Sequence, residues 1–255
     1  MSDSGDPIET GTDLRDQVAI VTGAGAGVGR ATAVALAAAG MQPVLVGRSV
    51  EALTETARLV AAVPNRGGEA IVAPADVADE AAVAAMVARA VAEAGGVDAL
   101  VCAAGVGRFG PVADYSLGDW RATLDTNLTG AFLCCREVLA SMRARGGGGI
   151  VAIGSGAGKQ GYANLAAYSA SKFGLLGLMQ SLAAEVATDG IKVATVVAGS
   201  ILTDFAGRPA AAKRADAAAD PTKRYLEAED IAAAVVFLLR QPRRAWTQEL
   251  NLWPF

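Results

Sequence analysis

The sequence of 255 residues contains no histidine. This absence excludes Ser-His-Asp triads, Cys-His dyads, HExxH helices and histidine-rich zinc sites. Cysteine is scarce as well: Cys102, Cys134 and Cys135 are the three present, two of them adjacent, and their spacing fits no metal site. We therefore expect no bound metal, and three scattered thiols favour a reducing, cytoplasmic location.

Charged residues make up only 19% of the chain, against roughly 25% in ordinary globular domains. Lysine and arginine number 22 and aspartate and glutamate 26, for a net charge of -4. Binding to a phosphate backbone requires a basic excess, so we expect no nucleic-acid partner. A surface with so few charges favours a buried interface between subunits.

Long apolar runs are also missing. The segment 232–239 is among the longest, far short of the ~20 residues of a membrane-spanning helix, so we expect no membrane segment. The acidic, polar start of the chain lacks the cationic and apolar regions of a signal peptide, and 1–16 are predicted to form a flexible tail. The remainder, 17–255, has the size of one domain.

Short apolar runs alternate with longer segments of helical periodicity, which is typical of a parallel sheet with helices on both faces. Strands are predicted at 17–22, 42–46, 69–73, 99–102, 150–153, 192–197 and 248–252. Helices are predicted at 28–39, 50–63, 80–94, 120–144, 165–187 and 228–240. The fold class is thus a single-domain, doubly wound α/β fold with seven parallel strands. The long connection 199–222 is predicted to be a partly helical lid over the site.

A glycine-rich turn joins the first predicted strand to the first helix. Gly23, Gly27 and Gly29 fit the pattern GxxxGxG rather than GxGxxG. Glycine lets the backbone approach a diphosphate closely, and the helix that follows offers unpaired N–H groups and a positive dipole end. We therefore predict a dinucleotide site at these glycines and Val28. The alternative is a flexible turn in a chain with 30 glycines.

Arg48 follows the second predicted strand, where a carboxylate would hold the ribose hydroxyls of NAD. A guanidinium group suits a 2′-phosphate instead, so NADP is favoured over NAD, unless Arg48 is simply a solvated side chain. Asp76, with Val77 beside it, follows the third strand. Its short carboxylate is predicted to reach the adenine amino group, or else to serve only as a turn residue.

Three further polar residues form a candidate catalytic set. Ser155 follows the fifth predicted strand, at the edge where open α/β sheets bind ligands. Tyr168 and Lys172 lie one helical turn apart on one face. A nearby ammonium group favours phenolate and lowers the tyrosine pKa, as proton exchange with a carbonyl oxygen requires. Such a pair alone is more often a half-buried aromatic with a solvated cation.

Taken together, these motifs resemble the short-chain dehydrogenases/reductases of the common single-domain branch. The matching residues, in that family's order between 17 and 252, are Thr22-Gly-x-x-x-Gly27-x-Gly29, Asn127 in DTNLTG, Ser155 and Tyr168-x-x-x-Lys172. The resemblance implies a Rossmann fold and a reductase or dehydrogenase that acts with NADP on a small ketone/secondary alcohol pair.

The resemblance also implies a role for each residue. Tyr168 exchanges the proton with the substrate oxygen, and Ser155 polarises that oxygen. Lys172 binds the nicotinamide ribose and lowers the pKa of Tyr168, while the cofactor carries the hydride. Asn127 anchors a water that links Lys172 to solvent, and Thr203 binds the carboxamide. For Asn127 the alternative is a polar helix end, and for Thr203 a loop cap.

Two segments depart from the family pattern. The chain has Cys102-Ala103-Ala104-Gly105 where the family often has Asn-Asn-Ala-Gly, and Ala198-Gly199 where it has Pro-Gly. The first change removes amides that tie strands together around the cofactor, although Gly105 keeps the close backbone approach. Cys102 is expected to be a small buried hydrophobe and not a nucleophile.

The expected substrate pocket is largely apolar. Its predicted walls are Val106, Phe109, Gln160, Tyr162, Ile201, Leu202 and Phe205. Basic residues in or beside the lid either attract an acidic substrate or are solvated surface charges: Arg208, Lys213, Arg214, Lys223 and Arg224.

Two other functions compete with a reductase. One is a catalytically retired dinucleotide sensor or structural subunit, against which the complete Ser155, Tyr168 and Lys172 set argues. The other is an epimerase or dehydratase of the extended branch, which needs a larger C-terminal substrate domain and another glycine spacing. As in many relatives, we expect a homotetramer, or else a dimer, formed through the helices that carry Asn127 and Tyr168 and through Trp253-Pro254-Phe255.

Overall fold

The structure is a computed structural model that describes residues 11–255. Most of the predicted tail, 1–10, lies outside the described residues. The rest of it is attached to the domain: the Thr12 N–H donates to Arg240 O at 2.7 Å, and Leu14 is buried.

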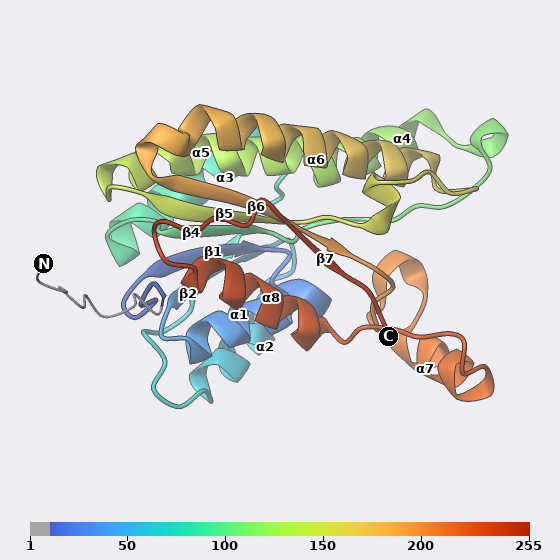
Figure 1. The fold of residues 1–255 in the computed structure, drawn as a ribbon, viewed down its shortest axis with the longest axis horizontal. Helices are drawn as coiled ribbons and strands as arrows, with labels where there is room; N and C mark the ends of the chain where they lie inside the picture. The colour runs from blue at the N-terminus through green and yellow to red at the C-terminus, as the bar shows by residue number, and fades with distance from the viewer. Residues whose placement is uncertain (1–10) are drawn as a thin grey trace, which may run out of the picture.

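One sheet of seven parallel strands forms the centre of the molecule, in the order β3-β2-β1-β4-β5-β6-β7 (Figure 1). The strands are β1 (Val18–Thr22), β2 (Gln42–Gly47), β3 (Ile71–Pro74), β4 (Ala99–Cys102), β5 (Gly148–Ile153), β6 (Ile191–Ala198) and β7 (Glu249–Leu252). The predicted α/β fold and its seven strands are therefore confirmed, with ends shifted by one or two residues.

Helices cover both faces of this sheet (Figure 1). On one face lie α3 (Glu80–Ala94), α4 (Leu117–Leu124), α5 (Gly130–Ala144) and α6 (Ala166–Val186); on the other lie α1 (Gly27–Ala38), α2 (Val50–Ala61) and α8 (Ala228–Arg240). Short 3-10 turns are η1 (Val112–Asp114), η3 (Gly156–Gly158), η4 (Ala187–Asp189) and η5 (Phe205–Gly207). Ser49 and Asp79 cap α2 and α3, accepting from Ala52 N at 3.1 Å and Ala82 N at 3.0 Å.

The helix predicted at 120–144 is interrupted. A π-helical turn, η2 (Asp125–Thr129), separates α4 from α5. Such a turn carries one extra residue and is common at functional sites because it re-aims a side chain. Here it contains the buried Asn127.

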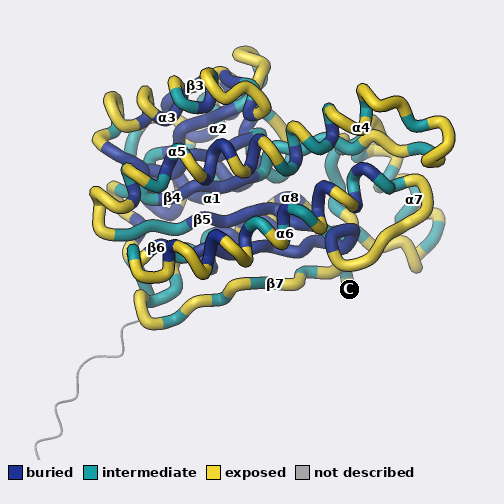
Figure 2. The backbone as a smooth tube through the Cα atoms, turned by 90° about the horizontal axis from the view of Figure 1, so that it is seen from above, coloured by how far each residue is buried: buried dark blue, intermediate teal, exposed yellow. Residues whose placement is uncertain are grey.

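The connection 199–222 contains α7 (Ala210–Ala219), which projects from the domain near the C-terminus (Figure 1). None of its residues is buried, and its backbone is coloured as exposed or intermediate in Figure 2. By contrast, every residue of β1 is buried, because core clusters pack on both faces of the sheet. The position of α7 therefore depends on something other than apolar packing.

The strand order reverses direction at β1, whose neighbours are β2 and β4. Ligands of open α/β sheets bind at such a switch point, outside the carboxyl ends of the strands. Among residues 11–255, no helix combines the length and apolar character needed to cross a membrane.

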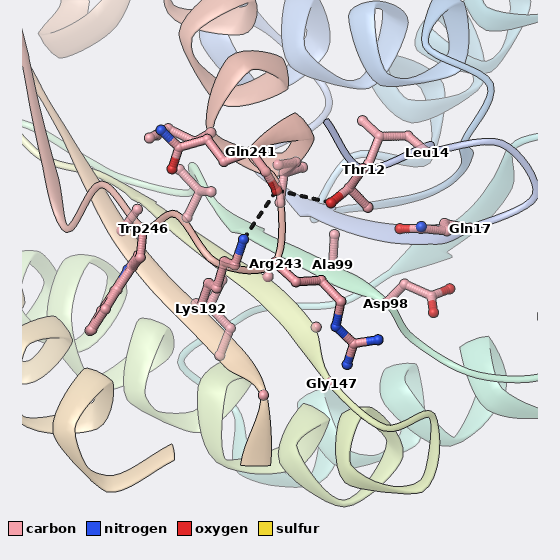
Figure 3. Close-up of a pocket in the computed structure, with 18 of the residues that line it drawn as sticks. Thr12, Leu14, Gln17, Asp98, Ala99, Gly147, Lys192, Gln241, Arg243 and Trp246 are labelled. Carbon is pink, nitrogen blue, oxygen red and sulfur yellow. Dashed lines mark hydrogen bonds between the residues drawn. The ribbon is translucent and has the colours of Figure 1, made fainter. Parts of the chain in front are cut away.

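A cavity of about 200 Å³ lies at the opposite edge, by the amino ends of β4, β5 and β6 (Figure 3). Its polar groups join separate segments: Lys192 Nζ and Thr12 Oγ1 both donate to Gln241 O, at 3.1 and 2.9 Å. Arg243 Nη2 donates to Gly146 O at 3.1 Å. This cavity is a junction between the start of the domain, β6 and the end of α8.

Candidate active site

A much larger cavity, of about 1460 Å³, opens at the carboxyl ends of the central strands. It brings together most of the predicted site residues: Gly23, Gly27, Val28, Gly29, Gly105, Phe109, Ser155, Tyr162, Tyr168, Lys172, Ile201, Leu202, Thr203 and Phe205. Predicted residues outside its lining are Arg48, Asp76, Val77, Val106, Asn127 and Gln160. The parallel sheet thus gathers residues that are far apart in the sequence.

The glycine turn begins one wall of this cavity. A Cβ at Gly29 would lie 2.2 Å from Gly23 O, and Gly23 itself has a φ of +68° with backbone of Ala103 within 2.9 Å. Gly27 also has a positive φ, +49°, and the methyl group of Thr203 lies 3.2 Å from where its Cβ would stand. Side chains are therefore excluded by close backbone contact as well as by conformation.

Arg30 and Thr56 hold this turn from outside, and the sequence analysis missed both. Arg30 donates through Nη2 to Gly25 O and through Nε to Thr56 Oγ1 at 3.0 Å. Thr56 Oγ1 in turn donates to Ala24 O at 2.8 Å. Two helices, α1 and α2, thus supply donors to carbonyl groups of the turn. Nothing in the spacing of these residues distinguishes them from ordinary surface positions.

Thr22 ties β1 to the segment after β4, where the family pattern of two asparagines is missing. Its Oγ1 accepts from Ala103 N and Ala104 N, each at 3.1 Å. Cys102 is buried, and the Cys135 thiol and burial both raise its pKa well above the ordinary range, so the group is a protonated thiol. A hydroxyl on β1 therefore holds this backbone.

Ser155 and Tyr168 meet at the floor of the cavity. Ser155 stands in extended conformation just after β5 and accepts from Ala157 N at 3.1 Å. Burial raises the pKa of Tyr168, and a hydrogen bond between its hydroxyl and that of Ser155 acts in the opposite direction. The phenol is therefore protonated over the neutral range, as a proton donor to a carbonyl oxygen requires.

Lys172 lies on α6, near the ring of Tyr168. Its ammonium is 5.7 Å from the centroid of the Tyr168 ring and donates to Ile153 O at 2.8 Å. Burial lowers the pKa of Lys172 to about 8. The two groups are on one face, as predicted, but the expected lowering of the Tyr168 pKa by Lys172 is not found, because desolvation dominates the pKa of the phenol.

Asn127 makes two hydrogen bonds to backbone groups and one to a side chain. Its Oδ1 accepts from Val106 N at 2.7 Å, and its Nδ2 donates to Val106 O at 2.9 Å and to Ser171 Oγ at 3.0 Å. Ser171 Oγ donates to Tyr168 O at 2.7 Å. Both N–H groups of the amide are thus engaged, and Asn127 joins the segment after β4 to the first turns of α6.

Two aromatic rings flank Tyr168. The centroid of Phe109 lies 5.8 Å from that of Tyr168 and the centroid of Phe205 lies 5.6 Å from it. A Cβ at Gly107 would lie within 3.0 Å of both phenylalanines, so these segments meet over the tyrosine. Tyr162 is half exposed at the mouth of the same cavity. Two residues of the predicted wall, Phe109 and Phe205, thus pack against the Tyr168 ring.

Arg48 and Asp76 stand apart from this centre, at the ends of β2 and β3. Arg48 is exposed and makes no hydrogen bond or ion pair with any residue in 11–255. Asp76 Oδ1 accepts from Ala78 N at 3.0 Å, which is the turn geometry given above as its alternative role.

Comparison with known proteins adds to this geometry. The family model of the short chain dehydrogenases matches residues 17–214. The chain belongs to the short-chain dehydrogenase/reductase family. It is 38% identical over 230 residues to the cis-4-hydroxycyclohexanecarboxylate dehydrogenase of Sinomonas cyclohexanicum, a match that covers 89% of this chain and 91% of that protein.

A longer relative shares only one region with the chain. The glycine betaine reductase ATRR of Emericella nidulans is 35% identical over 249 residues, which are 97% of this chain and 19% of that protein. Among solved structures, a metagenomic short-chain oxidoreductase in complex with NADP superimposes with a TM-score of 0.81 at 34% identity, covering 96% of this chain and 99% of the other. The chain is thus an oxidoreductase of this family.

Within this family member, the basic residues around 199–222 have partners in the chain itself. Arg208 pairs with Asp216, Arg214 with Glu227 at 3.2 Å, and Lys223 with Asp216 at 3.5 Å. Arg224 lies over the Phe255 ring, 5.6 Å from its centroid. Lys213 donates to backbone carbonyls. Two carboxylates, Asp216 and Glu227, therefore pair with three of these five cations.

Thr22→Val tests the tie between β1 and the segment after β4. We expect it to lower the free energy of unfolding by about 1–3 kcal/mol, because the N–H of Ala104 loses its acceptor. Thr32→Val is the matched control: the buried Oγ1 of Thr32 has no partner among the described residues, so its loss is neutral or stabilising. Urea unfolding of both variants measures this, and equal losses would contradict the assignment.

Proposed function

We propose that the protein is an NADP-dependent oxidoreductase that interconverts a ketone and a secondary alcohol through Ser155, Tyr168 and Lys172, with Asn127 as their support. The observation that carries this proposal is that the first three line one cavity with the glycine turn. A small-molecule carbonyl or alcohol is the expected partner. The competing role of a retired dinucleotide sensor is less favoured, because Ser155, Tyr168 and Lys172 are all present in one cavity.

The residues present fit a nicotinamide dinucleotide. The positive φ of Gly23 and Gly27 and the close approach at Gly29 leave a surface without side chains beside the first turn of α1, which suits a diphosphate. In our proposal Thr203, whose methyl group packs at Gly27, holds the carboxamide, and Lys172 holds the ribose. Arg48 would bind the 2′-phosphate. Asp76 and Val77 would lie near the adenosine, and Gly105 near the nicotinamide ring. When bound, the cofactor supplies or accepts the hydride.

The chain itself handles the proton. In reduction, the neutral phenol of Tyr168 gives its proton to the substrate oxygen, while the Ser155 hydroxyl stabilises the charge that develops there. The raised pKa of Tyr168 favours this acid form. Lys172, with a pKa of about 8, supplies a cation next to the phenolate that remains. The phenol thus serves as the acid in reduction, and the phenolate as the base in oxidation.

The substrate we favour is a small, apolar ketone. Phe109 and Phe205 pack against the ring of Tyr168, and Tyr162, Ile201 and Leu202 also line the cavity, whereas Val106 and Gln160 lie outside its lining. Arg208, Arg214 and Lys223 pair with Asp216 or Glu227 of the chain itself, so we assign them no role in selecting the substrate. We favour a cyclic substrate because the relative from Sinomonas cyclohexanicum is named for a cyclic secondary alcohol, one that also carries a carboxylate.

Tyr168→Phe tests the proton role. We expect it to retain cofactor binding and to lose about 10²–10⁴-fold in turnover, because the general acid is gone. Tyr162→Phe is the control: it removes the phenol hydroxyl of a half-exposed tyrosine in the same cavity and should change turnover little. Oxidation of NADPH with a panel of cyclic and linear ketones measures this, and unchanged turnover of Tyr168→Phe would overturn the mechanism.

Arg48→Ala tests the choice of cofactor. The parent enzyme should use NADPH in preference to NADH, and the variant should lose about tenfold or more of that preference, since a charge-assisted contact to the 2′-phosphate is removed. Arg58→Ala, which removes an exposed arginine from α2, is the control. Equal use of both cofactors by the parent would refute the role of Arg48.

We also propose a homotetramer. Its support is the exposure of aromatic residues on α5, α6 and the C-terminus: Phe132, Phe173, Trp253 and Phe255. Burying such side chains between subunits removes apolar area from water. Light scattering should give the mass of four chains, and a monomer would contradict the proposal. A cytoplasmic location, expected for a protein with three free thiols, is tested by cell fractionation.

A further inference from the structure

The position of α7 beside the cavity is set by polar contacts. The helix has no buried residue, so apolar packing contributes little to holding it. Two of its side chains, Arg214 and Asp216, make ion pairs through exposed groups, and exposed pairs of this kind contribute little to stability. Ala210 N donates to Asp204 Oδ1 at 2.7 Å at the start of the helix. The contact made by Lys213 differs from these because it is partly buried and reaches backbone carbonyl groups.

Lys213 points from α7 back toward the domain. Its Nζ donates to Thr203 O at 2.7 Å and to Ile201 O at 3.0 Å. The ammonium has three donors and no acceptor, so two backbone carbonyls suit it. Partial burial is the largest cause that lowers the pKa of Lys213, and the nearby Arg208 cation lowers it further. Lys213 is the residue of α7 that binds backbone at the end of β6.

The segment that Lys213 binds connects the glycine turn, which Thr203 contacts, with the Tyr168 ring, which Phe205 contacts. Ile201 makes a parallel bridge with Leu226, at the approach to α8. Thr203 packs its methyl group at Gly27 of the glycine turn. Two residues further, Phe205 lies against the Tyr168 ring. A displacement of this segment would therefore move the carboxamide side of the cofactor site and the aromatic wall together.

We propose that Lys213 is a positioning residue that fastens α7 to the 201–203 segment and thereby holds Thr203 against the glycine turn and Phe205 against Tyr168. Its effect on catalysis rests on the function proposed above. The contact itself does not, since it is made between residues of this chain. Lys213 acts through Thr203 and Phe205, and its own ammonium is occupied by the two carbonyls.

The test compares Lys213→Met with Lys223→Met. Both replace a lysine of the same connection by an apolar chain of similar length, but Lys223 reaches only the exposed Asp216 carboxylate, at 3.5 Å. Lys213→Arg keeps the charge and the donors. The first measurement is the rate at which elastase cleaves after the alanines at 217–219 of α7, a segment that all three variants retain. It requires neither cofactor nor substrate.

We expect Lys213→Met to raise that rate about tenfold, as the loss of one charge-assisted hydrogen bond implies, with Lys223→Met unchanged and Lys213→Arg in between. If Lys213→Met and Lys223→Met are cleaved alike, Lys213 does not hold α7 and the proposal fails. Circular dichroism of each variant checks that the rest of the domain is folded.

The second measurement is the Kd of NADPH, followed by its fluorescence, together with kcat and KM for a ketone. We expect Lys213→Met to bind NADPH about tenfold more weakly and to lose kcat, while Lys213→Arg recovers most of both. Faster cleavage with an unchanged Kd and unchanged kcat would overturn the positioning role. A parent enzyme that binds NADPH but reduces no ketone would refute the proposed function and leave the cleavage and Kd comparisons as the test of Lys213.

Discussion

A buried ammonium group is tolerated in a protein only where hydrogen-bond acceptors replace the water it has lost. Lys172 meets this condition by donating to Ile153 O, the last carbonyl of β5, from the second turn of α6. That bond sets the helix against the strand at one point. Because Ser155 follows the strand and Tyr168 precedes Lys172 by one turn, the same bond brings the two hydroxyls together. The site thus depends on a cation whose burial also lowers its pKa.

Side chains that hold backbone recur around the cavity. Thr22 accepts from two N–H groups after β4. Asn127 binds the backbone N–H and C=O of Val106, and Arg30 donates to a carbonyl of the glycine turn. Each fixes a segment without regular structure at the carboxyl end of the sheet. Such segments have few apolar contacts of their own, and polar clamps substitute for them. The replacement of two asparagines by Cys102 and Ala103 is compatible with this arrangement because the Thr22 hydroxyl supplies an acceptor.

The elements of the fold were predictable because their signals are local. Buried strands are continuous apolar runs, and α2 and α3 begin at Ser49 and Asp79, whose oxygens accept the N–H groups that a helix start leaves free. The π-helical turn at Asp125–Thr129 was not predicted, since one extra residue in a helix leaves the apolar period nearly unchanged. The roles of Arg30 and Thr56 were missed for a similar reason: their partners are carbonyl groups, which carry no trace in the sequence.

The sequence by itself determined the order of strands and helices along the chain, the glycine turn, and the spacing of Tyr168 and Lys172. Each of these follows from residue type and periodicity over a few positions. Only the tertiary structure decided which groups face one another. The pKa of Tyr168 is raised, where the spacing alone predicted a lowering, because burial disfavours the charged phenolate. The contacts of Phe109, Phe205 and Lys213 likewise join distant segments, and their distances arise only when the sheet brings the carboxyl ends of its strands to one edge.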